Sequence, residues 1–472
     1  MPPPMSRGVS RSGRFSVWHV LSLGLFLRAL LPILGYFYTR DLTSFYTPDT
    51  DSYVSPAREL IAHHRFFSGG LPEILRTPGY PLLLIPGLLL DRLELVTISL
   101  QIMLSCLTMY MVYRTAQLLF ECEKVAIVAA ALYAIEPVSI LYTSKLVTDT
   151  LFAALGMVWL YFLLKYLEGY RLRDLLISGM VLAASVYVRP IGYFLPLMVA
   201  TGLSAWALVN GRKNKQRLVV HIVLFIMVSM CPILIWQERN RMETGYPGFS
   251  GISAEDLYFY WAASVLADRQ HVPYFEMQHR LGFLDEGVYF ERHPEQKTWP
   301  LGQRLSYMNR EGKQILLSDP WTFARMHLKG TVRVIFDPGA TEFLKLLELY
   351  PKQGGAGLLV QLMDSGPLRT IGAAMTQRPL LFWSNVLLIP LELVYLLCAC
   401  VVLFSRRLMR EPAVVAAVLI IVYYVGISGG PAPGSFCRFR LPAMPIICVL
   451  AGYGMYLVRS RLHSRVGAEA AI

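Results

Sequence analysis

Charged side chains are scarce in this chain. Only 16% of its 472 residues are Asp, Glu, Lys or Arg, whereas 55% are hydrophobic. A soluble protein usually carries about a quarter charged residues. The apolar stretches 17–38 and 381–404 are each close to the ~20 residues that a helix needs to cross a bilayer. Because lipid offers no partners to the backbone, such stretches have to be helical, which excludes a soluble protein and predicts an all-α polytopic membrane protein.

Cysteine motifs and nucleotide motifs are also missing. Of the seven cysteines, five lie within apolar segments and none forms a CxxC pair, so neither a disulfide framework nor a zinc knuckle is expected. No Walker A sequence, dinucleotide-binding glycine pattern or zincin helix is present. His63 and His64 are adjacent and would point in different directions on a helix, which disfavours metal ligation. The sequence therefore predicts no metal ligands and no certain cofactor, and leaves a divalent metal open.

Positive charge is abundant but confined to short clusters. The formal net charge of +12 could suggest nucleic acid, yet the basic residues lie between apolar segments, as cytoplasmic anchors beside anionic lipids do. We expect membrane lipids as partners and no nucleic acid. About ten spans are predicted: 17–38, 94–118, 124–142, 149–167, 174–188, 190–209, 218–236, 380–404, 412–428 and 441–458. With the N-terminus inside, every cytoplasmic segment contains Lys or Arg: Arg7, Arg11 and Arg14; Lys124; Lys165, Arg171 and Arg173; Arg212, Lys213, Lys215 and Arg217; Arg406, Arg407 and Arg410; Arg459, Arg461 and Arg465.

Two long segments fall on the non-cytoplasmic side of this topology. We predict an N-terminal transmembrane module at 1–238 with a first external loop at 39–93, an external loop domain at 239–379 and a C-terminal transmembrane module at 380–472. Within the first loop, residues 80–90 are too short to cross and are typical of an interfacial helix. Residues 319–337 alternate apolar and basic side chains, which fits an amphipathic helix on the outer leaflet or a surface helix of a small domain equally well.

Acidic residues follow directly after the first span. The stretch Thr47-Pro48-Asp49-Thr50-Asp51-Ser52-Tyr53 places two carboxylates just beyond the membrane. A partly desolvated acid at this position could take a proton from an acceptor hydroxyl as a general base. Alternatively, Asp49 caps a helix that begins near Asp51, which is a common role for Asp. Composition alone favours the capping interpretation.

This stretch and the string Arg76-Thr77-Pro78-Gly79-Tyr80-Pro81 resemble the first external loop of the lipid-carrier-dependent glycosyltransferases of the GT-C superfamily. That group includes protein O-mannosyltransferases and the bacterial enzymes that add aminoarabinose to lipid A. Its bacterial members have a Pro-Asp-Ser-x-x-Tyr pattern, in which Thr50 here replaces Ser. The resemblance implies a GT-C-like bundle with an external loop domain, and assigns the essential aspartate to Asp49, with Asp51 as an additional acid.

Three shorter matches lie farther along the chain. They are Leu141-Tyr142-Thr143-Ser144-Lys145 with Asp149, where the family usually has Glu; Arg189-Pro190; and Arg438-Phe439-Arg440-Leu441-Pro442 with Pro445. On the predicted topology the charged residues of all these strings lie on the non-cytoplasmic side, most at the outer end of a span. The phosphate of a polyprenyl-phosphate sugar lies at this depth, and arginine pairs well with phosphate oxygens. The alternative for each cation is pairing with lipid headgroups.

The resemblance thus implies an inverting glycosyltransferase that moves a sugar from a polyprenyl-phosphate donor to a lipid, glycan or protein acceptor. Asp49, with Asp149 and Asp51, supplies the catalytic carboxylates. The candidate donor-phosphate and substrate-binding residues are Arg76, Tyr53, Lys145, Arg189, Arg438, Arg440 and His63. A transporter or flippase is the alternative from another class, although no internal repeat supports it. A ligase or polymerase of lipid-linked glycans would keep the site but release a diphosphate. In a bacterium the site would face the periplasm from the inner membrane.

Overall fold

The computed structural model describes residues 16–209, 215–350, 358, 367–430 and 436–469. Within these residues the chain is helical except for one short antiparallel hairpin, β1 (Phe67–Ser68) and β2 (Leu71–Pro72), in which Phe67 lies opposite Pro72. Arg7, Arg11, Arg14, Arg212 and Lys213, which carry part of the predicted topology, lie outside the described residues, as do the side chains of Lys215, Arg461 and Arg465.

Among the described residues, six helical segments are long and apolar enough to cross a membrane. Five of them are α1 (Val17–Thr39), α4 (Leu93–Phe120), α7 (Asp149–Gly169), α10 (Lys215–Thr244) and α20 (Pro379–Leu403). The sixth, Pro190–Leu208, consists of the 3-10 helix η2 (Pro190–Gly192) and most of α9 (Leu195–Val209). Shorter apolar helices are α3 (Gly79–Leu89), α21 (Pro412–Ser428) and the first part of α23 (Met444–Glu469). The predicted all-α multi-pass membrane architecture is confirmed.

The predicted span 124–142 is instead two helices, α5 (Glu123–Ala134) and α6 (Pro137–Tyr142). The break has a local cause, because the Glu136 carboxylate accepts hydrogen bonds from the backbone N–H groups at the start of α6, and Pro137 occupies its first turn. Arg28, fully buried on α1, donates to the carbonyls of Ala134 (2.9 Å) and Tyr133 (3.0 Å). These bonds satisfy the carbonyls that the end of α5 leaves unpaired within the membrane.

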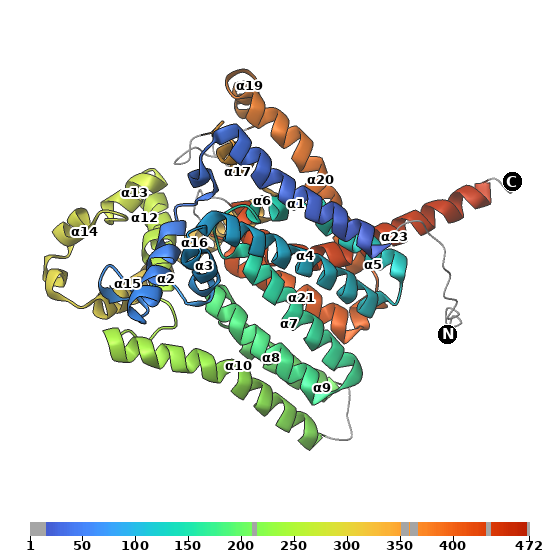
Figure 1. Ribbon diagram of the computed structural model, residues 1–472, viewed down its shortest axis with the longest axis horizontal. Coiled ribbons are helices and arrows are strands. Elements are labelled where there is room, and N and C mark those ends of the chain that lie inside the picture. Colours follow the sequence, from blue (N-terminus) through green and yellow to red (C-terminus); the bar gives the residue numbers. More distant parts are fainter. Residues whose placement is uncertain (1–15, 210–214, 351–357, 359–366, 431–435, 470–472) are drawn as a thin grey trace.

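The membrane helices form one packed bundle. α7 packs against α4 and against α8 (Leu172–Val188), which also contacts α10; α23 packs against α20, α4 and α5. Figure 1 shows this bundle on one side of the molecule and the helices α12 to α15 at the opposite end from α23. The buried side chains of the bundle make a single large cluster, so the helices form a continuous support beneath the external segments.

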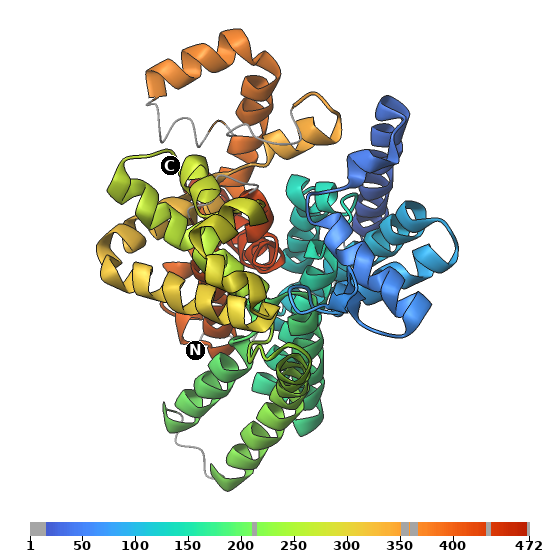
Figure 2. The same cartoon turned by 90° about the vertical axis from the view of Figure 1, so that its left-hand side faces the viewer.

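The segment between α10 and α20, predicted to be external, is helical, and its first part packs around a hydrophobic core separate from that of the bundle. Its elements are α11 (Ile252–Glu255), the π-helical segment η3 (Asp256–Ala262), α12 (Ala263–Gln270), α13 (Tyr274–Arg280), α14 (Glu286–Arg292), the 3-10 helix η4 (Pro294–Thr298), α15 (Leu301–Ser318), α16 (Pro320–Phe336), α17 (Ala340–Leu346) and α19 (Pro367–Gln377). Tyr258, Phe259, Met277 and Tyr289 are buried together with Ile74 of the first loop. Figure 2 views the molecule from this end and shows the domain (yellow-green to yellow) covering one half of the face and the first loop (blue) covering the other.

The predicted amphipathic stretch 319–337 is indeed helical. Asp319 caps α16 by accepting from the backbone N–H of Thr322 (3.1 Å), and α16 packs on α12, α21 and the short helix α22 (Phe436–Arg440). Its apolar residues Trp321 and Leu328 are exposed. Placement on the outer leaflet surface stays a prediction.

The first external loop contains the 3-10 helix η1 (Leu42–Phe45), α2 (Thr50–His63), the β hairpin and α3. Gly79, in the Arg-Thr-Pro-Gly-Tyr-Pro string, lies directly against α8, where a Cβ would be 2.7 Å from the Tyr187 carbonyl oxygen. Any larger residue would push α3 away from the bundle. The predicted short helix at 80–90 is therefore present, and its glycine sets how closely the loop approaches the membrane helices.

Candidate functional site

Five charged residues from five separate segments form one continuous set of ion pairs. Arg76 Nη2 lies 2.8 Å from Asp49 Oδ1, and Arg438 Nη1 lies 2.7 Å from Asp49 Oδ2. Arg438 also donates through Nε to Asp149 Oδ2 (2.8 Å), and Arg189 pairs with Asp149 Oδ1. We call this set the arginine–aspartate chain. All five residues were candidates from the sequence, and the fold brings them together.

Asp49 occupies the N-cap position of α2, but its side chain makes no capping hydrogen bond. Asp49 therefore lies at the N-terminus of the helix, as the capping interpretation requires, but its carboxylate does not cap the helix. The segment is held by other bonds instead. Thr50 Oγ1 accepts from the Thr47 backbone N–H (2.8 Å) and donates to the carbonyl of Leu146 (3.0 Å). These bonds leave the Asp49 carboxylate to face the arginines.

Arg76 is positioned by its neighbours in the first loop. Its Nε donates to Ser52 Oγ (2.9 Å), its Nη1 donates to the Tyr53 hydroxyl (3.2 Å), and its guanidinium lies 4.7 Å from the centre of the Tyr53 ring. Glu73 fixes the turn before it by accepting from the backbone N–H groups of Leu75 (2.6 Å) and Arg76 (2.8 Å). The predicted substrate residue Tyr53 is thus part of the site, as the aromatic support of Arg76.

Asp149 is fully buried in the first turn of α7, where the helix dipole favours a negative charge. Arg189 ends α8 in an extended conformation immediately before Pro190, and Arg438 comes from the middle of α22. Gln101 of α4 donates to the carbonyls of Thr143 and Lys145 (both 2.9 Å), which holds the turn that leads into Asp149. Asp149 and Arg189 thus lie at the ends of bundle helices, whereas Asp49 and Arg76 come from the first loop and Arg438 from the short helix α22.

The arginine–aspartate chain contains more positive than negative charges. Three arginines and two aspartates leave one net positive charge. Burial alone would raise the pKa of Asp49, but Arg438 and Arg76 outweigh this effect and hold the pKa of Asp49 well below its usual range. Asp49 is consequently ionised at all physiological pH values, with each oxygen bound to an arginine.

Other predicted residues lie apart from the chain. Asp51 is exposed on α2, and no hydrogen bond or ion pair joins its side chain to any residue that the structure describes. His63 is exposed in the last turn of α2, about 20 Å from Asp49 at ~1.5 Å per residue. Lys145 is buried and donates from Nζ to the carbonyl of Ser44 (2.9 Å). The geometry therefore distinguishes Asp49 from Asp51 and places neither His63 nor Lys145 on the arginine–aspartate chain.

Arg440, which the sequence proposed for donor-phosphate binding, lies apart from the arginine–aspartate chain. Although it is only two residues from Arg438, it is buried and directed toward α16 and α20. Its Nη2 lies 2.6 Å from Glu392 Oε2, and its Nη1 donates to the carbonyls of Val334 (2.9 Å) and Ile335 (2.8 Å). Since its donors are engaged within the fold, Arg440 ties helices together, and the geometry does not support a contact with a donor phosphate.

Two carboxylates that no sequence motif indicated approach the site from the external domain. Glu255 ends α11 and Asp256 begins the π-helical segment η3, and both side chains are half-buried. Burial raises the pKa of Glu255 to about 7, and burial together with Glu255 raises the pKa of Asp256 to about 7. The charge of Arg76 lowers the pKa of both acids, and the charge of Asp49 raises the pKa of Asp256. Glu255 and Asp256 therefore interact electrostatically with the arginine–aspartate chain. The only signal in the sequence is an acidic pair that precedes an aromatic run.

The arginine–aspartate chain does not suit a divalent metal in this arrangement. All four oxygens of Asp49 and Asp149 have arginine partners, and arginines beside the site would repel a cation. Among the described residues no group of three or more His, Cys, Asp or Glu side chains could hold a metal ion. We therefore derive no chemical step through a metal.

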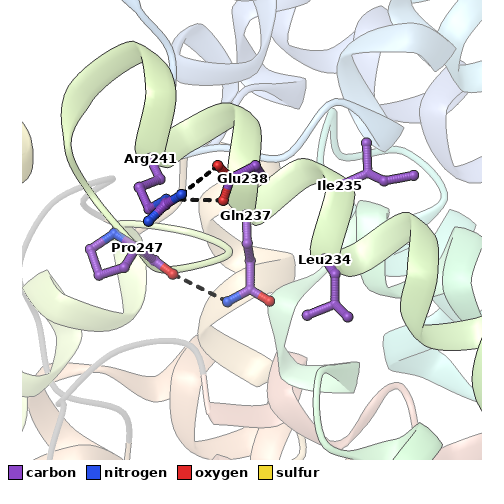
Figure 3. A pocket seen from close by; sticks show the side chains of 6 residues that line it. All are labelled: Leu234, Ile235, Gln237, Glu238, Arg241 and Pro247. Atoms are coloured by element: carbon purple, nitrogen blue, oxygen red, sulfur yellow. Dashed lines mark hydrogen bonds and ion pairs between the residues drawn. The ribbon is translucent and has the colours of Figure 1, made fainter.

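An open pocket of about 410 Å³ lies elsewhere, on the outer part of α10. Figure 3 shows Leu234 and Ile235 beside Gln237, which donates to the carbonyl of Pro247 (3.2 Å), and the Glu238–Arg241 ion pair (2.7 Å). The pocket is lined by no residue of the arginine–aspartate chain. Its exposed ion pair is of a kind that contributes little to binding or stability, and we assign it no role.

Comparison with known proteins gives a matching family and matching folds. Residues 77–236 match the sequence model of the dolichyl-phosphate-mannose-protein mannosyltransferase family. The fold is similar to that of the oligosaccharyltransferase AglB from Archaeoglobus fulgidus, in complex with an inhibitory peptide and dolichol-phosphate (TM-score 0.53, 16% identity, 97% of this chain and 52% of AglB) and in the apo form (TM-score 0.51, 16% identity, 97% and 52%). ArnT from Cupriavidus metallidurans, bound to undecaprenyl phosphate, matches at a TM-score of 0.39 (14% identity, 93% and 78%), too low to carry an argument. No curated protein sequence matches significantly.

The family match and the fold confirm the resemblance to lipid-carrier-dependent glycosyltransferases of the GT-C superfamily. The chain spans about half the length of AglB, and what the two proteins share is the fold. The matched segment contains Asp149 and Arg189 but ends before Arg438 and begins after Asp49. The complete arginine–aspartate chain is therefore a feature of the three-dimensional structure, beyond the matched segment.

Proposed function

We propose that this protein is an integral membrane glycosyltransferase that moves a sugar from a polyprenyl-phosphate donor to an acceptor on the non-cytoplasmic face, with inversion at the anomeric carbon. The observation that carries the proposal is the arginine–aspartate chain, in which one arginine from the first loop, one from the end of α8 and one from α22 share two aspartates. A lipid-linked phosphate reaches this site from the bilayer. The inversion follows from the family resemblance.

The net charge of the chain favours a monophosphate donor. A polyprenyl-phosphate sugar is a phosphodiester with one negative charge, which matches the one net positive charge of three arginines and two aspartates. A diphosphate linkage carries two negative charges and would leave one without a counterion. Arginine presents paired N–H groups that suit phosphate oxygens. This charge balance supports a monophosphate-dependent transferase over a ligase or polymerase of diphosphate-linked glycans.

The reaction needs little from the protein on the donor side. The acceptor oxygen forms a bond to the anomeric carbon while the bond from that carbon to the phosphate oxygen breaks, and polyprenyl phosphate leaves. Because phosphate is already a good leaving group, no acid has to protonate it, in contrast to ordinary glycoside hydrolysis. Arg76, Arg189 and Arg438 would stabilise the charge that develops on the departing phosphate.

Asp49 is the proposed general base for the acceptor hydroxyl. Both of its oxygens are bound to arginines, so this role requires the donor phosphate to draw one Nη group of Arg76 or Arg438 away. Asp149 is fully buried and holds Arg438 and Arg189, which makes it a positioning residue. The proposal therefore links donor binding to release of the base. In a bacterium, the site would face the periplasm from the inner membrane.

The test uses purified protein in lipid, a panel of polyprenyl-phosphate sugars, and lipid, glycan and peptide acceptors, with release of polyprenyl phosphate as the measurement. Wild type should release it, and Asp49→Asn should lose on the order of 10²–10⁴-fold in rate, the usual contribution of a general base. Asp51→Asn, two residues away but exposed, is the matched control and should behave like wild type. Equal rates for Asp49→Asn and wild type, with both folded, would refute the role of Asp49. Release of a diphosphate, or substrate accumulation in vesicles without cleavage, would favour the ligase or the transporter.

A further inference from the structure

A second pocket, of about 280 Å³, lies between the ends of α4 and α7 that are predicted to be cytoplasmic. The residues that line it are Arg114, Gln117, Leu118, Glu121, Tyr161 and Glu168. On α7, Glu168 is about 28 Å beyond Asp149 at ~1.5 Å per residue. On α4, Glu121 is about 30 Å beyond Gln101, which holds the turn that leads into Asp149. The pocket is therefore about one hydrocarbon thickness (~30 Å) from the arginine–aspartate chain, and the proposed reaction does not use it.

Arg114 places a positive charge in the wall of this pocket. It lies inside α4, about 9 Å before the helix ends at Phe120, and its side chain is half-buried. In the part of the chain that the structure describes, no carboxylate lies within ion-pair distance of its guanidinium. An arginine inside a membrane helix is costly unless a polar partner compensates its charge. The position of Arg114 therefore suits an anion supplied by another molecule.

Two tyrosines orient the Arg114 side chain. Its Nη1 donates to the Tyr110 hydroxyl (3.0 Å) and its Nη2 donates to the Tyr161 hydroxyl (3.3 Å). The guanidinium lies 5.9 Å from the centre of each ring. Because the Tyr161 oxygen accepts from Arg114, its O–H proton can go to a further acceptor, and the described residues supply none. The pocket thus presents a guanidinium and a phenol O–H, both of which are good donors to phosphate oxygens.

Two carboxylates line the same pocket nearer the water. Glu121 is the C-cap residue of α4, Glu168 lies in the last turn of α7, and both are exposed. Neither forms an ion pair with a cation of the described chain. The pocket therefore has a positive group deeper in the membrane and two negative groups at its surface. This order of charges matches a phospholipid headgroup in which the phosphate is next to the acyl chains and an ammonium lies beyond it.

An apolar face of α4 leads directly to Arg114. Met103 and Leu107 are exposed by 67% and 41%. Residues three or four apart share a face of a helix, so the face of Met103 and Leu107 continues through Tyr110 and Arg114 to Glu121. An acyl chain lying along Met103 and Leu107 would bring its headgroup to the pocket. This continuity favours a lipid over a soluble ligand with the same polar group.

We propose that this pocket binds a zwitterionic phospholipid with a primary ammonium headgroup, phosphatidylethanolamine. Its phosphate accepts from Arg114 and Tyr161, and its ammonium donates to Glu121 and Glu168. An anionic phospholipid would bring a second negative charge to a pocket that already carries one in excess. A quaternary ammonium has no N–H to donate to the glutamates, and Arg114 already lies against the tyrosine rings that could otherwise receive it. The volume of the pocket, just below the ~300 Å³ at which small-molecule sites usually begin, suits a compact headgroup.

Native mass spectrometry of the delipidated full-length protein tests this assignment. The probes are phosphatidylethanolamine, phosphatidylcholine and phosphatidylglycerol with identical acyl chains, and wild type should bind phosphatidylethanolamine most tightly. Arg114→Gln should raise the Kd for phosphatidylethanolamine about tenfold or more, as loss of a hydrogen bond to a charged group usually does. Arg171→Gln is the matched control, since Arg171 is exposed just after α7 and does not line the pocket. It should keep the wild-type Kd.

Soluble phosphoethanolamine distinguishes the two sources of the headgroup. It lacks acyl chains and should not displace phosphatidylethanolamine at equal concentration. Displacement at equal concentration would assign the pocket to a soluble zwitterion and overturn the lipid proposal. Equal wild-type affinities for phosphatidylethanolamine and phosphatidylcholine would overturn the role of the ammonium.

Variants of the pocket that are expected to fold normally keep the proposal falsifiable. Glu121→Gln/Glu168→Gln should reduce the preference for phosphatidylethanolamine over phosphatidylglycerol by about two- to tenfold, as two exposed charge pairs would. Glu123→Gln, which removes an exposed acid in the first turn of α5 outside the pocket, should leave this preference unchanged. Tyr161→Phe should weaken phosphatidylethanolamine binding several-fold without a change in charge, with a thermal unfolding temperature close to that of wild type. Equal Kd values for wild type, Arg114→Gln and Tyr161→Phe would overturn the proposal.

Discussion

Arg438 and Arg440 lie two residues apart on α22 but have opposite environments. Among the described residues Arg438 pairs with two carboxylates, those of Asp49 and Asp149, and the Asp49 side chain keeps 30% of its surface exposed. Arg440 and its partner Glu392 expose only 1% and 5%, and backbone carbonyls take up its remaining donors. One short helix therefore carries an arginine that can exchange a carboxylate for a phosphate and another that cannot.

The type of hydrogen-bond acceptor distinguishes arginines that could bind a substrate from arginines that hold the fold together. Carbonyl acceptors from helix ends cannot leave without breaking the fold, whereas a carboxylate that is itself partly hydrated can. The same distinction applies to Arg28, whose donors go to the carbonyls of Tyr133 and Ala134 and to the hydroxyls of Ser105 and Ser139. We infer that buried charge alone does not mark the site, and that carboxylate pairing at an accessible position does.

Removing Arg440 should have the largest effect of the substitutions considered, and this effect should be a loss of folding stability. Arg440→Met leaves Glu392 buried without its cation, which typically costs about 3–5 kcal/mol. We expect a marked loss of thermal stability in detergent or nanodiscs, while the activity per folded molecule changes by less than about threefold. The double variant Arg440→Met/Glu392→Leu should recover much of the stability because it removes both charges. A stable Arg440→Met protein without activity would break the distinction between the two arginines.

Removing Arg438 should have the next largest effect, and on turnover. Arg438→Gln leaves Asp49 paired with Arg76 and Asp149 paired with Arg189, so the fold retains its charge pairs. Loss of one group that stabilises a developing anion typically costs about 10²–10³-fold in rate. Release of polyprenyl phosphate should fall by this factor, with a thermal unfolding temperature close to that of wild type. Turnover unchanged from wild type would remove Arg438 from the proposed phosphate site.

The acids of the site should respond to pH in opposite directions. The pKa of Asp256 is raised to about 7 in the folded state, so its contribution to stability is complete below the unfolded pKa of about 4 and is lost as the pH rises through 7. Asp256→Asn should therefore lose less stability than wild type between pH 4 and pH 7, by a few degrees in Tm. Asp49, whose pKa is lowered, contributes stability that is lost only as the pH falls below about 4. Identical Tm profiles for wild type and Asp256→Asn would contradict this assignment.

Much of the membrane architecture could be predicted from the sequence, because long apolar segments in lipid have only one backbone solution. The break at Glu136 was missed, since a continuous apolar count does not register a buried acid that caps a new helix. The five residues of the arginine–aspartate chain were found through family-like strings. Arg440 was grouped with Arg438 because both belong to the same string, and the packing of α16 and α20 separates their environments.

Glu255 and Asp256 could not have been found from the sequence by the same route. They belong to no recognised string, and an acidic pair in an external domain is ordinarily a solvated surface. Their proximity to Arg76 depends on contacts between segments about 175 residues apart, such as the bond from Ser250 to Leu75. Their half-buried state depends in turn on the π-helical register of η3. A short sequence pattern does not encode this kind of long-range juxtaposition.

The smallest effects are expected from candidate residues that the fold leaves outside the arginine–aspartate chain. Asp51 lies two residues after Asp49 and has the same chemistry, and His63 lies at the far end of the same helix, exposed and 3.9 Å from Glu59. Asp51→Asn and His63→Ala should each change the rate of polyprenyl phosphate release by less than about twofold and the unfolding free energy by less than about 0.5 kcal/mol, as surface substitutions usually do. A large loss in Asp51→Asn would mean that the acceptor contacts the exposed face of α2.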